Sequence, residues 1–256
     1  MKLFLRYFLP ITYFQATRLN RWDLVAYNGL VEWVPAIALS LFFGSVALET
    51  VGTVVLSYLA FICVYEIGYI TNDALSESFE DDPRGRSELF VTSSLSIWAL
   101  VGARVVFWFL ISFLLGALGN AVWIGFHSTL LITFILHNSV RNEHRTATFF
   151  GLSTYRYFAP MILTLSPAIL TVLLPTILLN NSLYRTTVYV RNKTNGIQSK
   201  PSVGSKLAFY AACMPLSIFL SVFFASIIPI VVCLYFVCIW LLYWLASKLS
   251  VRANPS

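Results

Sequence analysis

The chain has 256 residues, of which 58% are hydrophobic and only 11% are charged. Its mean hydropathy is +0.78, and apolar runs of about twenty residues recur along it, which is typical of membrane proteins and excludes the soluble globular classes. The formal net charge is +6, and we expect a membrane and its lipids as partners and no nucleic acid.

The N-terminal segment, residues 1–26, mixes basic and aromatic residues with leucine. It lacks a small-residue cleavage site, so the pattern predicts an interfacial amphipathic helix and not a removable signal peptide. Residues 27–256 show no internal repeat, low-complexity tract or domain boundary. We expect them to form a single transmembrane helical domain.

The apolar runs predict an all-α polytopic membrane bundle of about eight transmembrane helices, each about 17–25 residues long. Pro167 disfavours a helical conformation at the preceding residue, so we expect two spans joined by a turn there. The alternative is one span preceded by a polar segment. The expected spans are 27–48, 52–72, 94–117, 119–139, 147–164, 167–184, 206–226 and 228–247.

The distribution of basic residues favours eight spans over seven. With eight spans, the basic loops and both basic ends of the chain lie on one side of the membrane. With seven, the basic loop 185–205 would lie outside, against the positive-inside tendency. We therefore expect an integral protein of the plasma (inner) membrane whose termini and active site are cytoplasmic.

The stretch YEIGYITNDALSESFEDDPRGR, residues 65–86, passes from an apolar span into a dense group of acids. Asp73, Glu77 and Asp81 are four residues apart, so they share one face while the helix persists, where like charges repel. Carboxylate and amide oxygens are the kind of ligands that Mg²⁺ prefers. The spacing predicts a Mg²⁺ site formed by Asn72, Asp73, Glu77 and Asp81. The alternative is a solvated acidic loop that merely ends the helix.

Two arginines lie inside apolar spans, where an unpaired guanidinium is costly and must face a cavity, a carboxylate or a phosphate. For Arg156 we expect a substrate contact. Arg104 could equally pair with an intramembrane acid, Glu66 or Glu32. Basic residues also follow the acidic group, and their guanidinium groups suit bidentate hydrogen bonds to phosphate.

The stretch ITNDALSESFEDDPRGR resembles the first aspartate-rich motif of the UbiA superfamily of intramembrane prenyltransferases. Upstream, TRLNRWDLVAYNGLVEWVPAIAL is similar to the stretch that leads into the first helix of that family. The resemblance covers about the first 90 residues, and it is nearest to the polyprenyl-phosphate phosphoribosyltransferase branch. It implies a UbiA-like helix bundle.

The chain departs from the family pattern in several places. Strict alignment puts Ser76 and Glu80 where the family has aspartates, whereas one extra residue would recruit Glu77 and Asp81 instead. The late aspartate pair of the family is absent. In its place Tyr189 and Lys193 form a YxxxK pattern of the kind that accompanies the second site of the family.

The resemblance implies an intramembrane Mg²⁺-dependent transferase that displaces pyrophosphate from an anionic diphosphate donor. We favour phosphoribosyl transfer from phosphoribosyl diphosphate to a polyprenyl phosphate lipid. The alternatives are prenyl transfer from an isoprenoid diphosphate to an aromatic or other small acceptor, and a non-enzymatic lipid-binding or assembly subunit. The expected catalytic residues are Asp73, Glu77, Asp81 and Arg156. The expected substrate-binding residues are Asn72, Glu80, Asp82, Arg84, Arg86, His137, Asn138, Arg141, Arg145, Tyr189 and Lys193.

Overall fold

The computed structural model of the chain describes residues 7–19, 21–44, 48–79, 94–140, 144–194 and 202–253. Within these ranges side chains are described except at 75–79, 94, 95, 194 and 247–253. Every element in the described ranges is a helix, which confirms the expected all-α class.

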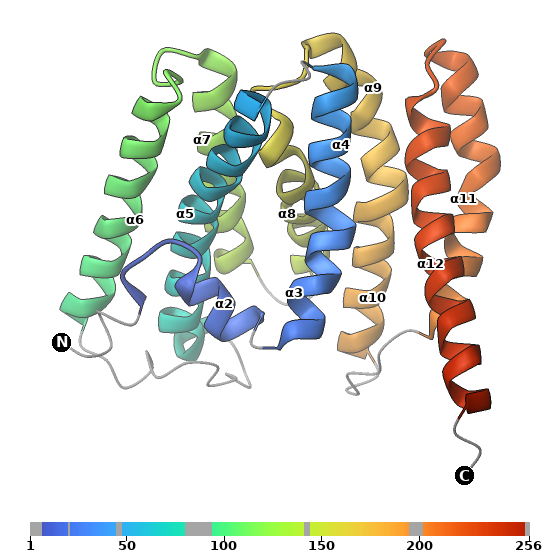
Figure 1. Cartoon of the computed structure of the whole chain (residues 1–256). Helices are drawn as coiled ribbons and strands as arrows, with labels where there is room; N and C mark the ends of the chain where they lie inside the picture. Colours follow the sequence, from blue (N-terminus) through green and yellow to red (C-terminus); the bar gives the residue numbers. More distant parts are fainter. Residues whose placement is uncertain are drawn as a thin grey trace. The chain divides into compact units, whose positions relative to one another are not determined.

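The chain divides into two compact units, Met1–Ser166 (unit 1) and Pro167–Ser256 (unit 2). The sequence suggested a single helical domain over 27–256 and gave no sign of this boundary. Within each unit, consecutive long helices run in opposite directions (Figure 1).

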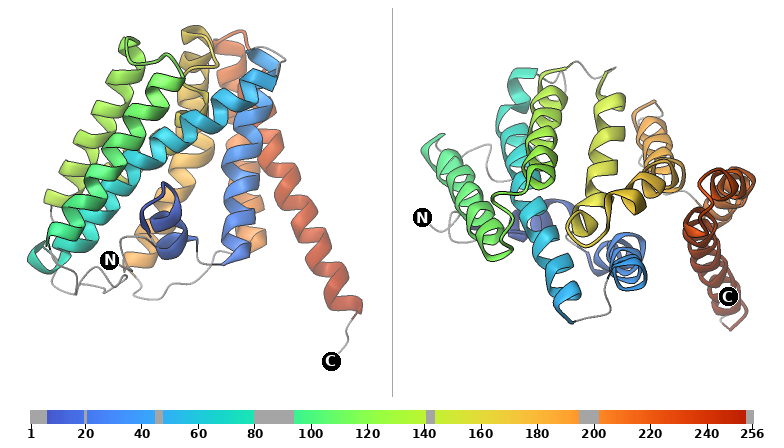
Figure 2. Two further views of the ribbon diagram at one scale, coloured as in Figure 1. Left: turned by 60° about the vertical axis from the view of Figure 1, so that its left-hand side comes forward. Right: turned by 90° about the horizontal axis from the view of Figure 1, so that it is seen from above.

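Unit 1 is organised around the long helix α5, which packs against α4, α6, α7 and η3. Figure 2 shows α5 crossing the unit at a slant. The short helix α2 also contacts α5. The elements of unit 1 are α2 (Thr12–Arg18), α3 (Trp22–Asn28), the π-helix η1 (Gly29–Trp33), α4 (Val34–Phe43), α5 (Leu48–Phe79), α6 (Ser94–Leu114), α7 (Ala121–Ser139), α8 (Arg145–Phe158) and the 3-10 turn η3 (Ala159–Met161).

Unit 2 consists of one long interrupted helix and a helical hairpin. The long helix runs through α9 (Pro167–Ile177), the π-helix η4 (Leu178–Ser182) and α10 (Leu183–Thr194). The hairpin pairs α11 (Val203–Phe223) with α12 (Ile228–Ala253). Stacked rings of Tyr210 and Phe236, with centroids 4.9 Å apart, hold the hairpin together.

Seven helices in the described ranges are long and apolar enough to cross a membrane, so the chain is an integral membrane protein. They are Trp22–Phe43, Leu48–Ala74, Ser96–Leu114, Ala121–Ser139, Pro167–Lys193, Val203–Phe223 and Ile228–Ala246.

The expected fifth span, 147–164, is not among these seven. It forms α8 and η3, and α8 has only 14 residues. Arg145 and Arg156 of α8 are both buried, and α8 packs beside α7 within unit 1 (Figure 1). A helix that lies among other helices can carry polar residues that a lipid-facing helix cannot. The orientation of the termini, which was argued from an even number of spans, stays a prediction.

Two π-helical turns interrupt the membrane-spanning helices, η1 in unit 1 and η4 in unit 2. A proline lies next to each of them, Pro35 just after η1 and Pro175 just before η4. Proline lacks the N–H of an α-helical hydrogen bond and crowds the preceding turn, which favours such local irregularities. π-Helical turns occur frequently at functional sites, and both turns here carry buried polar residues.

Candidate functional site

One face of α5 carries the polar centre of unit 1. Glu66 and Asp73 lie seven residues apart on this face, and they are only 0% and 3% exposed. Both carboxylates contact the N-terminal segment Tyr7–Leu19. The aromatic residues Tyr13 and Phe14 of this segment are buried in unit 1. The segment that we expected to lie as an amphipathic helix at the membrane interface therefore packs against α5.

Arg104 of α6 forms an ion pair with Glu66, with 2.5 Å between Nε and Oε2. Its Nη1 and Nη2 donate hydrogen bonds to the backbone carbonyls of Phe8 and Tyr7. The other Glu66 oxygen accepts a hydrogen bond of 2.6 Å from the Phe14 N–H. Backbone groups outside a helix need such partners inside a membrane protein, because the hydrocarbon offers none. The Arg104–Glu66 pair thus binds the N-terminal segment to α5 and α6.

Asp73 has partners from the same segment. Arg18 Nη2 lies 3.1 Å from Oδ1, and the Tyr13 hydroxyl donates a hydrogen bond of 2.5 Å to Oδ2. The Arg18 guanidinium lies 4.4 Å from the centroid of the Tyr69 ring. Burial opposes the charge on Arg18, but Tyr69 and Asp73 outweigh it and raise the pKa of the guanidinium above its ordinary value. Arg18 is therefore a permanent cation beside Asp73.

A third buried pair joins α8 to η1. Arg156 Nε donates a hydrogen bond of 2.6 Å to Glu32 Oε2, and Nη2 donates to the side-chain oxygen of Asn28. The guanidinium also lies 4.9 Å from the centroid of the Phe14 ring. Nη1 makes no hydrogen bond to any residue that the structure describes. Arg156 thus keeps one donor group for a further acceptor.

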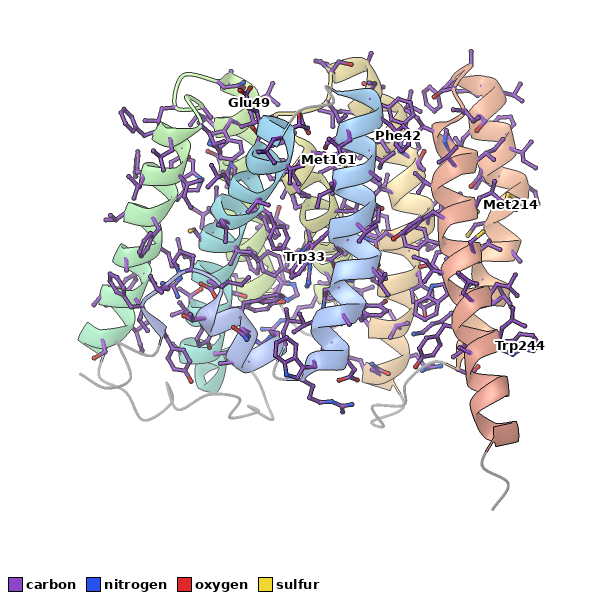
Figure 3. All side chains as sticks on the ribbon, viewed as in Figure 1. Trp33, Phe42, Glu49, Met161, Met214 and Trp244 are labelled. Atoms are coloured by element: carbon purple, nitrogen blue, oxygen red, sulfur yellow. The ribbon has the colours of Figure 1, made fainter. Side chains whose placement is uncertain are left out.

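Aromatic rings fill the space among these pairs. Tyr65 is at their centre, with ring centroids 4.8 Å from Phe61, 4.8 Å from Phe134 and 4.9 Å from Tyr69. The Tyr69 hydroxyl lies 3.3 Å from that of Tyr65. In Figure 3, Trp33 and Met161 lie on the inner side of unit 1, whereas Glu49 lies at the start of α5. The candidate site is therefore an aromatic interior bordered by three arginine–carboxylate pairs.

Several expected site residues of unit 1 are placed by hydrogen bonds near the Asp73 end of α5. Asn138 Nδ2 donates to the Gly68 carbonyl at 3.1 Å and to the Thr71 hydroxyl at 3.3 Å. His137 Nδ1 lies 2.7 Å from the Thr148 hydroxyl of α8. Arg145 Nε donates to the Val140 carbonyl at 3.2 Å. These contacts join α5, α7 and α8.

The remaining expected residues lie beside Asp73, in unit 2 or outside the described residues. Asn72 is half-buried on α5 beside Asp73, and Glu77 belongs to the helix but its side chain is not among those described. Tyr189 and Lys193 belong to unit 2, where the Lys193 Nζ lies 5.0 Å from the Tyr189 ring centroid. The residues outside the described ranges are Glu80, Asp81, Asp82, Arg84, Arg86 and Arg141.

Of the four residues of the expected Mg²⁺ site, the structure describes the side chains of Asn72 and Asp73. Among the residues described, no group of three or more His, Cys, Asp and Glu side chains is placed to hold a metal. Asp73 offers oxygen atoms of the right chemistry, but Arg18 and Tyr13 already donate to both of them. A cation at Asp73 would have to compete with these donors or share the carboxylate with them.

Reasoning from the sequence missed Tyr13 and Arg18 as partners of Asp73. The available signal was the pair of acids at a seven-residue spacing, since two buried carboxylates on one face of a helix need two donors.

The comparisons with known proteins add no relative: no family model, no curated protein and no solved structure matches the chain.

Proposed function

We propose that this integral membrane protein is a transferase that displaces pyrophosphate from a diphosphate-activated donor at the Asp73 end of α5. The proposal rests chiefly on one observation: a buried aspartate at the end of a tyrosine-lined helix face, with a permanent cation beside it. The aromatic interior suits the chain of an isoprenoid lipid. The acidic helix end suits a metal-bound diphosphate.

In this proposal Asn72, Asp73, Glu77 and Asp81 hold Mg²⁺, which would stabilise the charge that develops on the leaving oxygens. Arg18 holds the Asp73 carboxylate in place through the ion pair between them. The free Nη1 group of Arg156 offers a hydrogen bond to an anionic group inside the bundle. The proposed site uses residues of unit 1 alone.

The favoured reaction is phosphoribosyl transfer from phosphoribosyl diphosphate to a polyprenyl phosphate. The resemblance of residues 70–86 to the phosphoribosyltransferase branch supports this choice. The lipid phosphate is itself the nucleophile, so the reaction needs no strong general base. A prenyl diphosphate donor with an aromatic or other small acceptor is the alternative that would use the same acidic helix end.

A non-enzymatic lipid-binding or assembly role has a specific observation in its favour. The hydrogen bonds from Arg18 and Tyr13 satisfy Asp73 without any ligand. In that case Asp73 would fasten the N-terminal segment to α5 and do nothing else.

The deciding experiment is thermal unfolding of the purified protein with phosphoribosyl diphosphate or geranylgeranyl diphosphate, each with and without Mg²⁺. A ligand that binds the folded state raises Tm by mass action. We expect a Mg²⁺-dependent shift with phosphoribosyl diphosphate that Glu77→Gln abolishes. Asp23→Asn is the matched control, because Asp23 forms an exposed ion pair with Arg21.

Each alternative predicts a different result. A Mg²⁺-dependent rise in Tm with geranylgeranyl diphosphate alone would support the prenyltransferase alternative. No shift with either donor, together with an unchanged cellular role of the Glu77→Gln protein, would overturn the transferase proposal and leave the lipid-binding or assembly role.

A further inference from the structure

Arg18 is the last residue of α2, and its guanidinium meets α5 at Asp73. Figure 1 shows α2 beside the C-terminal half of α5, which it contacts. A single guanidinium nitrogen, Nη2, makes both contacts to the carboxylate, 3.1 Å to Oδ1 and 3.3 Å to Oδ2. Nη1 lies 3.4 Å from the adjacent Thr17 carbonyl, and Nε has no hydrogen bond to any residue that the structure describes. The ion pair therefore leaves Nε for another acceptor.

Arg18 differs in this respect from Arg104, the other arginine that joins the N-terminal segment to α5. Arg104 is 0% exposed, and all three of its guanidinium nitrogens donate hydrogen bonds. The Arg18 side chain is 15% exposed, so part of it is accessible to a ligand. Arg104 is thus a closed structural contact, whereas Arg18 has an unused donor and an accessible surface.

The N-terminal segment does not depend on Arg18 to stay in place. Glu66 accepts a hydrogen bond of 2.6 Å from the Phe14 N–H, and Arg104 binds two further backbone carbonyls of the segment. A partly exposed ion pair contributes little to stability, because water competes with it and the long side chain loses freedom in it. The guanidinium of Arg18 can therefore leave Asp73 while the rest of the segment stays bound to α5.

The charges of the Arg18–Asp73 pair oppose single ligands and favour two ligands together. The guanidinium repels a cation that approaches Asp73, and the carboxylate repels an anion that approaches Arg18. Mg²⁺ prefers carboxylate oxygens together with substrate phosphates, and a guanidinium binds phosphate oxygens through parallel hydrogen bonds. A metal ion and a diphosphate that arrive together therefore give each member of the pair a new partner of opposite charge.

We propose that Arg18 is a diphosphate-binding residue that exchanges its partner. Without ligand it pairs with Asp73, and when Mg²⁺ occupies that carboxylate the guanidinium turns to the diphosphate group of the donor. This inference rests on the proposed function and adds the N-terminal segment to its site. The diphosphate group is common to both candidate donors, so the role of Arg18 is the same for either donor.

The test uses the full chain in phosphatidylcholine nanodiscs and two probes, Mn²⁺ and inorganic pyrophosphate. Electron paramagnetic resonance of free Mn²⁺ measures metal binding without pyrophosphate. Equilibrium dialysis of labelled pyrophosphate, with Mg²⁺ or with a chelator, measures anion binding. For the natural protein we expect pyrophosphate to bind about tenfold more tightly with Mg²⁺ than without it, which is the coupling that an exchange of partners predicts.

Arg18→Gln should give opposite results for the two probes. It removes the cation that competes for Asp73, so we expect Mn²⁺ alone to bind about tenfold more tightly. It also removes the partner of the diphosphate, so pyrophosphate with Mg²⁺ should bind about tenfold more weakly. Arg21→Gln is the matched control, because Arg21 is a nearby arginine whose ion pair with Asp23 is exposed, and it should change neither affinity.

Arg18→Lys keeps the test decisive if Arg18→Gln does not fold. Lysine keeps a positive charge opposite Asp73 but lacks the planar fork of the guanidinium. We expect the Mn²⁺ affinity of this variant to stay close to that of the natural protein and its pyrophosphate affinity with Mg²⁺ to fall several-fold. Equal pyrophosphate affinities for the lysine variant and the natural protein would argue against a guanidinium contact.

The outcomes separate this inference from the transferase proposal. In one, the natural protein binds pyrophosphate with Mg²⁺, but Arg18→Gln shifts both affinities in the same direction or leaves them unchanged. Arg18 is then a structural contact, and only the exchange of partners is overturned. In the other, the natural protein binds no pyrophosphate with or without Mg²⁺, and the transferase proposal fails together with this inference.

Discussion

The Tyr13 hydroxyl donates a 2.5 Å hydrogen bond to Asp73, a residue sixty positions away in the sequence. Arg18, one turn further along the same short helix, pairs with the other oxygen of the carboxylate. The N-terminal segment therefore forms part of the surroundings of Asp73. Any ligand of this carboxylate meets Tyr13 and Arg18 as well.

Replacement of Tyr13 by phenylalanine should destabilise the protein by about 1.5–3 kcal/mol, the usual contribution of a hydrogen bond to a charged group. The ring stays, so packing is preserved. Thermal unfolding in detergent measures the effect. Tyr243→Phe is the control, because Tyr243 is exposed. Equal Tm values for the two variants would contradict the hydrogen bond to Asp73.

Arg104→Met should cost about 3–5 kcal/mol, because it leaves Glu66 buried and charged without its partner. The same substitution at Arg21, whose ion pair with Asp23 is exposed, should change stability by less than about 1 kcal/mol. Proteolysis near residues 7–19 should also become faster in Arg104→Met, since Arg104 binds the carbonyls of Tyr7 and Phe8. An unchanged proteolysis rate would argue against this role.

Variants of the buried ion pair of Glu32 and Arg156 test whether Arg156 has a function beyond balancing the charge of Glu32. Arg156→Met alone strands a buried carboxylate, and we expect a loss of stability of about 3–5 kcal/mol. Adding Glu32→Leu removes both charges and should restore most of this loss. If the double variant is folded but has lost its cellular role, Arg156 does more than balance Glu32. Full retention of that role would make the pair purely structural.

Gly68 permits the close approach of α7 to α5. A Cβ atom at this position would lie 2.2 Å from Cδ1 of Phe134, which is far inside van der Waals contact. Gly68→Ala should therefore destabilise the protein by about 1–3 kcal/mol. Gly52→Ala on the same helix meets nothing within 4 Å and should be neutral or stabilising by up to about 1 kcal/mol. Chemical denaturation of both variants measures their free energies of unfolding and so tests these two expectations.

Cysteine labelling tests the predicted orientation of the chain in the membrane. The helix Trp22–Phe43 is long enough to cross the membrane, so Asp23→Cys and Glu49→Cys should lie on opposite sides. In a background without Cys63, Cys213, Cys233 and Cys238, an impermeant maleimide should label position 49 in intact cells and position 23 only after permeabilisation. The reverse pattern would place the N-terminal segment, and with it the proposed active site, outside.

Some features of this protein follow from the sequence because they depend on local properties. Hydropathy and length predict where apolar helices lie, and seven such helices are present. The segment 147–164 is not among these seven, because it forms a helix of only 14 residues with η3 after it and carries the buried Arg156. The spacing of Glu66 and Asp73 on one face of α5 was also readable, because helical periodicity is local.

The sequence by itself thus determined that the chain is a helical membrane protein with costly charges inside its helices. Only the tertiary structure decided which charges meet: Arg104 with Glu66 across 38 positions, Arg18 with Asp73 across 55, and Arg156 with Glu32 across 124. The physical reason is that a buried charge needs an opposite charge close by in space. Periodicity identifies the face of a helix on which a charge lies, but the packing of helices and of the N-terminal segment supplies its partner.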